Sequence, residues 1–148
     1  MNGQDFLRIA HEALEPFLKE LGFAMDEPSI SGRYYRVSFT APQSAVSVSY
    51  EPGDDALFVM VFGRKNGQLS DIDNRKETPR LSDLNSRYMA AVTQAERVVN
   101  EKAFESVLVH DNEERQLLKA AKELRLVLPK YLRSPDGLRP PCLPWRDG

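Results

Sequence analysis

The sequence predicts an α+β fold: an N-terminal helix, then a four-stranded antiparallel meander, then two C-terminal helices packed on the sheet. Apolar residues recur with helical spacing near both ends of the 148-residue chain. Between residues 35 and 63 they alternate with polar residues, which is the two-residue period of a strand. We expect residues 1–132 to form one α+β domain and residues 133–148 to form an irregular, proline-rich tail.

The first helix is predicted over residues 5–21, where apolar residues follow the i, i+3, i+4 spacing of one helix face. Asp5 is the expected N-cap, and Gly22 stands where a left-handed residue ends a helix. Pro16 lacks an amide hydrogen, so it predicts either a kink or two short helices with Pro16 opening the second.

Four strands are predicted over residues 35–40, 46–51, 56–63 and 69–72. The pair Asn66-Gly67 predicts a two-residue type I′ hairpin turn before the last strand. The third strand is apolar on both faces. It is therefore either covered on both sides or exposes one face to a partner.

Helical spacing resumes at Leu81, with Ser82 as the expected N-cap and an apolar stripe that includes Val98 and Val99. A further helix is predicted to start after Asp111. Pro129 is expected to end or bend it.

Composition limits the class of protein. The chain is 41% apolar with a net charge of −2, and no run approaches the length of a membrane span. It has one cysteine, and its first residues lack the pattern of a signal peptide. We therefore expect a cytoplasmic protein without membrane contact.

No catalytic or metal-binding pattern stands out, so we expect no enzyme activity and no cofactor. The two histidines, His11 and His110, are not placed to activate Cys142, and no cluster has zinc-ligand spacing. The segment 71–74 begins like a calcium loop but lacks its glycine and its final glutamate. An enzyme remains an alternative if a cleft buries a carboxylate such as Glu51 or Asp73.

Two sets of residues are candidates for binding another protein. If Leu57 and Val59 face the helices, then alternate residues of the third strand form an apolar strip on the other face, near Tyr34. The alternatives are cover by the last helix or tail, or by a homodimer. The members of this set are Tyr34, Phe58, Met60 and Phe62.

The second set is basic. Arg115, Lys119 and Lys122 follow helical spacing within residues 112–133, which carry six basic and three acidic side chains. Residues 1–74 hold 6 basic and 11 acidic side chains, whereas residues 75–148 hold 14 and 11. The set is either a solvated helix face or a contact for an acidic partner protein. Nucleic-acid binding is not expected, because stacking aromatic residues are scarce nearby.

Four segments carry a resemblance to a known group. These are Phe17–Phe23, the Val-x-Val-x-Tyr-Glu pattern at residues 46–51, the strand Leu57–Arg64, and the helical stretch 117–124. Together they resemble a group of uncharacterised small bacterial α+β proteins. Chains of this size and pattern are also found among toxin-neutralising immunity proteins, which bind a toxin and catalyse nothing. The resemblance implies no catalytic residue.

These observations predict a non-enzymatic protein-binding module, such as an immunity protein that binds a toxin domain. The alternative is a secretion-chaperone-like dimer that binds an effector, since such proteins also open with a helix followed by three strands. A homodimer is compatible with either hypothesis.

Overall fold

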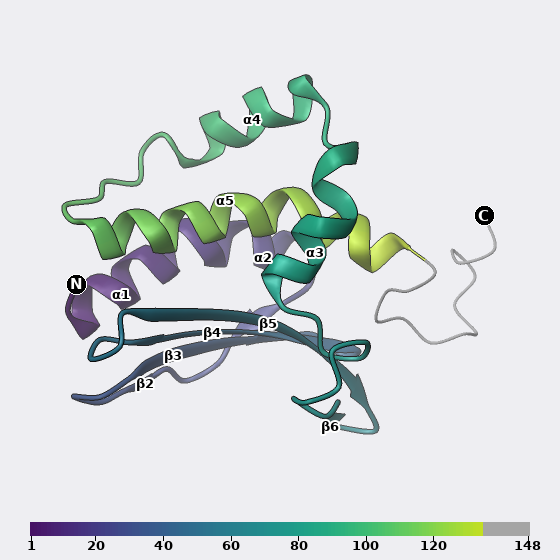
Figure 1. Cartoon of the computed structure of the whole chain (residues 1–148), viewed down its shortest axis with the longest axis horizontal. Helices are drawn as coiled ribbons and strands as arrows, with labels where there is room; N and C mark the ends of the chain where they lie inside the picture. Colours follow the sequence, from purple (N-terminus) through teal and green to yellow (C-terminus); the bar gives the residue numbers. More distant parts are fainter. Residues whose placement is uncertain (135–148) are drawn as a thin grey trace.

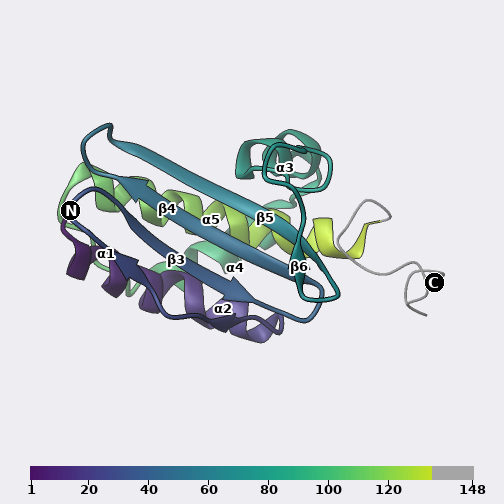
Figure 2. The ribbon, with the colours of Figure 1, turned by 90° about the horizontal axis from the view of Figure 1, so that it is seen from below.

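The computed structural model describes residues 1–134, which form an antiparallel sheet with all of the helices on one of its faces (Figure 1). Helices α1, α2 and α5 lie directly on the sheet, and α4 lies on the other side of α5 (Figures 1 and 2). The predicted α+β fold is therefore confirmed. The predicted tail falls almost wholly on residues 135–148, which lie outside the described part.

The N-terminal helical region has three parts: α1 (Gly3–Ile9), a π-helical turn (Ala10–Leu14) and α2 (Glu15–Glu20). The wider turn accommodates Pro16, which has no amide hydrogen for an α-helical bond. Two short helices with Pro16 near the start of the second are thus confirmed. Asp5 is not the N-cap: Asn2 caps α1, and Asp5 completes its capping box.

The sheet has six strands in the order β1-β3-β4-β5-β6, with β2 also pairing to β3. The three long strands, β3 (Tyr35–Thr40), β4 (Ser44–Glu51) and β5 (Ala56–Lys65), match the predicted segments. The short strands β1 (Ala24–Met25) and β2 (Ser29–Ile30) were not predicted, because two residues show no alternation.

The predicted fourth strand is shorter than expected. β6 covers only Gln68–Leu69, and it pairs with Arg64 and Lys65 of β5. Asn66 and Gly67 both have positive φ angles, 54° and 79°, as a type I′ turn requires. The chain then leaves the sheet, and the hydroxyl of the fully buried Thr78 donates to the carbonyl of Asp71 within the loop that follows.

Three helices follow the sheet within the described residues, instead of the two predicted. They are α3 (Leu81–Tyr88), α4 (Gln94–Phe104) and α5 (Asn112–Arg133), with a short 3₁₀ turn (Met89–Ala91) after α3. Thr93 forms a capping box with Glu96, and this local signal starts α4 as a separate helix.

One further expectation about these helices is wrong: Arg80, and not Ser82, occupies the N-cap position of α3, and its N–H donates to the Asp83 carboxylate. Of the two effects expected of Pro129, an end to the helix does not occur, because Pro129 lies inside α5. Asp111 caps α5 as predicted, with its carboxylate accepting from the N–H of Glu114.

The core lies between the sheet and the helices. Val98 and Val99 are 47% and 58% exposed, so they are not part of it. Helix α4 instead buries Asn100 and Phe104, because the break at residues 89–93 changes which face of the helix points inward. The largest fully buried side chains include Phe6, Ile9, Leu14, Leu18, Phe39, Leu84, Leu117, Leu124, Leu128 and Tyr131.

Candidate functional site: the open face and outer edge of β5

Strand β5 exposes apolar side chains on the sheet face that the helices leave free. Val59 and Val61 are buried toward the helices, whereas Phe58 is 41% exposed, and Met60 and Phe62 are half-buried. We call Phe58, Met60 and Phe62 the open-face strip. None of the described helices covers this face (Figure 1). Of the two orientations that the sequence leaves open for the third strand, the structure has the one in which Val59 and Val61 face the helices.

The open-face strip borders a flat row of small residues on β4. Phe58 lies opposite Ser49, Met60 opposite Ser47, and Phe62 opposite Ala45. Ser47 and Ser49 are half-buried, whereas Ala45 is only 5% exposed, so the open face is more accessible at Phe58 than at Phe62.

The structure separates the other predicted contact residues from this strip. Tyr34 lies in the turn between β2 and β3, where its N–H donates to the Ser31 hydroxyl. Because β4 lies between β3 and β5, this turn is two strands away from the strip. Tyr34 therefore lies at the β3 side of the sheet and the open-face strip lies on β5, so the two are not neighbours.

The basic set lies on α5, in the helical layer. The Lys122 Nζ lies 2.9 Å from a carboxylate oxygen of Glu101 on α4, so this ammonium is already ion-paired within the protein. Arg115 and Lys119 are exposed. Lys119 alone of the three lines a groove beside β5.

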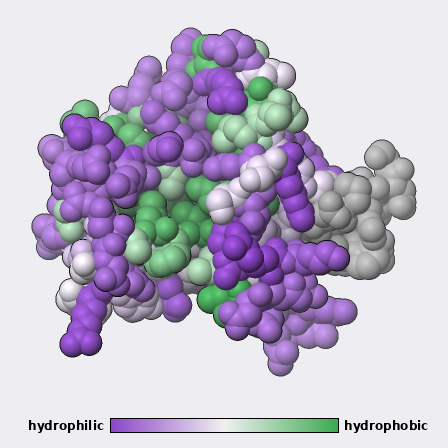
Figure 3. All heavy atoms as spheres, viewed as in Figure 1, coloured by the Kyte–Doolittle hydropathy of each residue, from purple (hydrophilic) through white to green (hydrophobic). Residues whose placement is uncertain are grey.

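That groove is the hollow between the outer edge of β5, the start of α3 and the exposed side of α5. Figure 3 shows hydrophobic side chains gathered in this region, with hydrophilic ones around them. We call it the edge groove, and its volume is about 390 Å³. Its lining includes Leu57, Phe58, Val59, Arg80, Leu81, Asn85, Lys119, Ala120 and Glu123, so Phe58 of the open-face strip also borders the groove.

The backbone of β5 is unpaired along this groove. On its outer side, β5 pairs with β6 at residues 64–65 and with Arg80 at Met60. The N–H of Val61 donates outward to the carbonyl of Pro79, at 3.0 Å. Since β-strand residues alternate, Leu57 and Val59 also direct their N–H and C=O groups outward, where no strand of the described chain pairs with them.

Polar groups on the groove walls are only partly satisfied. Arg80 donates to the carbonyl of Thr78 at 2.8 Å. The buried Oδ1 of Asn85 has no hydrogen-bond partner, and Lys119 has no ion pair within residues 1–134. Sequence analysis missed this site, because its walls come from three segments and the position of the sheet edge is not encoded in any one of them.

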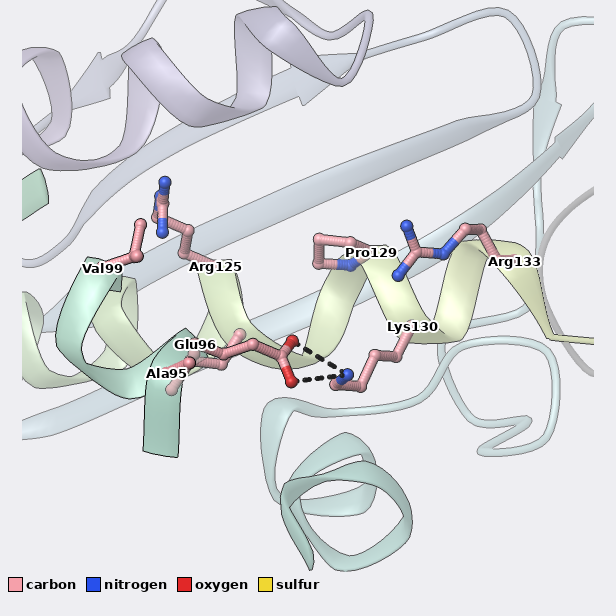
Figure 4. A pocket seen from close by; sticks show the side chains of 8 residues that line it. Ala95, Glu96, Val99, Arg125, Pro129, Lys130 and Arg133 are labelled. Carbon is pink, nitrogen blue, oxygen red and sulfur yellow. Dashed lines mark hydrogen bonds and ion pairs between the residues drawn. The ribbon is translucent and has the colours of Figure 1, made fainter. Parts of the chain in front are cut away.

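A second cleft lies between α4 and α5 and is lined by Glu96, Val99, Arg125, Pro129, Lys130 and Arg133 (Figure 4). A Glu96 oxygen lies 3.0 Å from the Lys130 Nζ. The N–H of Thr93 and the Lys130 ammonium lower the pKa of Glu96 to about 2. Arg125 donates to the side chain of the buried Asn100. These charges hold the two helices together, so we assign the cleft a structural role.

The carboxylates and histidines of the described residues do not gather into a metal-binding cluster. Within residues 1–134 no group of three His, Cys, Asp or Glu side chains could hold a metal ion. The buried Glu114 is neutralised by Arg8 at 2.7 Å. Glu51 is half-buried, Asp73 is exposed, and neither lines the edge groove. Cys142 lies outside the described residues.

Burial and the hydrogen bond that the Tyr50 hydroxyl donates to Asp55 raise the pKa of this hydroxyl. No helix among the described residues combines the length and the apolar character needed to cross a bilayer.

No protein-family model, curated protein or solved structure was found to match the chain.

Proposed function

We propose that this protein is a non-enzymatic binding module that docks another protein through the open-face strip. The observation that carries the proposal is Phe58, an aromatic side chain 41% exposed on a sheet face that no described helix covers. Aromatic residues and methionine are enriched at the centres of protein interfaces.

Isolated exposed apolar side chains are common on soluble proteins and need no explanation. The strip differs because three apolar side chains, Phe58 exposed and two half-buried, alternate along one strand and share one face. The flat serine row beside them gives a partner access to the rings without displacing bulky side chains. Burying these rings would supply hot-spot contacts, each worth about 2 kcal/mol or more.

The partner is proposed to be a toxin domain, with the protein acting as an immunity protein, or alternatively a secreted effector. The two versions differ in oligomeric state. An immunity-type module would bind its toxin as a monomer, whereas a chaperone-like protein would be a dimer before it binds. Light scattering at about 50 μM (near the Kd range of weak dimers) separates the two.

The test uses partner capture followed by a quantitative comparison. Tagged protein captures a partner from an extract of its own source, mass spectrometry identifies it, and the purified partner is titrated against variants. Phe58→Ser and Phe62→Ser should each weaken binding about 30-fold, the effect of losing 2 kcal/mol. Their thermal midpoints should stay within a few degrees of the parent's.

Leu108→Ser is the matched control, because Leu108 is 67% exposed and lies between α4 and α5, away from the sheet. It should leave the affinity unchanged. If both strip variants bind as tightly as the parent protein, the open-face strip is not the docking surface.

A further inference from the structure

The open edge of β5 differs from every other edge of the long strands. The outer side of β3 is closed by β1 and β2, and β4 is central. The second half of β5 is closed by β6 and by the contact of Met60 with Arg80. Only residues 56–59 are left without a neighbouring strand among the described residues. Unpaired strand edges bind further strands, and proteins usually cover or charge them.

We propose that the edge groove binds an extended segment of a partner protein, which adds to the sheet as a strand beside residues 56–59. This goes beyond docking at the open-face strip, because it uses the backbone of β5 and the opposite layer of the molecule. Leu57 and Val59 supply two N–H donors and two C=O acceptors at the spacing that one added strand can pair with.

The groove walls indicate the chemistry of the segment. Leu57, Leu81 and Ala120 form apolar walls that suit an aliphatic side chain. Arg80 and Lys119 bring two positive charges against one negative charge, that of Glu123. A segment that alternates apolar residues and carries an Asp or Glu side chain beside them would complement this lining.

Helix α3 stands beside the edge of β5 (Figure 2), and the open stretch is only four residues long. A single extended segment needs no more than this length to pair with the edge, so we assign it as the occupant, and a dimer through two copies of β5 is an outcome of the test.

The test selects twelve-residue peptides on the full-length protein from a random phage-displayed library. We expect enriched peptides with alternating apolar residues and at least one acidic side chain. Hydrogen exchange measured by NMR should show slower exchange at the amides of Leu57 and Val59 in the peptide complex. The amides of Phe58 and Met60 already face β4, so they should change little.

Two variants test the contacts. Leu57→Pro removes an N–H that the fold leaves unpaired, and Lys119→Glu reverses a wall charge. Each should weaken the selected peptide at least about tenfold. Lys102→Glu, the same charge reversal at an exposed site on α4, is the control and should leave the affinity within about twofold.

The variants' far-ultraviolet circular dichroism must match that of the parent protein, and the exchange data test the proposal even if Leu57→Pro fails to fold. Three results would overturn it. They are no enriched peptide, a peptide that leaves exchange at Leu57 and Val59 unchanged, or a dimer by light scattering in which those amides are already protected.

Discussion

The two faces of the sheet show how differently neighbouring residues of the same strands are used. Toward the helices, Val37, Val48 and Val61 are fully buried. Toward the open face, β3 and β4 present Ser38, Ser47 and Ser49, whereas the same face of β5 carries aromatic residues and methionine. Two strands thus follow the usual inside-outside pattern and one breaks it. The break lies beside the one edge of the long strands that no other strand of residues 1–134 closes.

The largest test of this comparison replaces a phenylalanine on each face. Phe39→Ala should lower the free energy of unfolding by about 3–5 kcal/mol, because the ring is fully buried and leaves a cavity. Phe58→Ala should cost about 1 kcal/mol or less, the range of strand propensity at a partly exposed site. Urea denaturation measures both. Equal losses would mean that the open-face strip is buried in solution.

The next test asks whether helix α4 and the sheet unfold independently of each other. Asn100 is 2% exposed, donates to the Lys122 carbonyl at 3.0 Å and accepts from Arg125. Asn100→Ala leaves both groups without this partner, so we expect a loss of about 1–3 kcal/mol. Lys102→Ala, an exposed change on the same helix, should cost little.

Hydrogen exchange shows where the Asn100→Ala effect falls. Amides of α4 should exchange faster, while those of β5 that pair with β4 keep their protection. Faster exchange throughout the sheet would show that α4 and the sheet unfold as one unit.

The smallest effect concerns pH. The pKa of Glu96 falls from 4.5 to about 2 in the folded protein. Its carboxylate therefore stabilises the fold above pH 4.5, and this contribution is lost as the pH falls toward 2. Glu96→Gln keeps a capping side chain but removes the charge.

Thermal midpoints should consequently differ between parent and Glu96→Gln at pH 6 and converge near pH 2. Glu105→Gln, an exposed residue with no ion pair among residues 1–134, is the control and should show no such convergence. A constant difference for Glu96→Gln would rule out the lowered pKa as its cause.

Local signals in the sequence predict most of the fold. Pro16, the Asn66-Gly67 turn and the cap at Asp111 each act within a few residues, and the structure has them where expected. The errors arise where two local signals compete. Apolar spacing through Val98 suggested one continuous helix, but the capping box of Thr93 and Glu96 starts a new one.

The candidate site divides in the same way. Alternation within residues 56–63 predicts that Phe58, Met60 and Phe62 share one face of the strand, but it does not say which face is open. Which face the helices cover depends on how separate elements pack. Grouping Lys119 with Arg115 and Lys122 by helical spacing missed the fact that only Lys119 borders β5.

The sequence by itself determined the order of the elements, the turns between them and the two faces of each strand, because these depend on backbone preferences and side-chain periodicity over a few residues. Tertiary structure alone decided where the sheet ends. The pairing of Arg80 with Met60 closes one half of the β5 edge and leaves residues 56–59 open beside α3 and α5. A strand lies at the edge of a sheet when no other strand pairs with one of its sides. Whether this happens depends on how all the elements pack, and no single segment of the sequence encodes it.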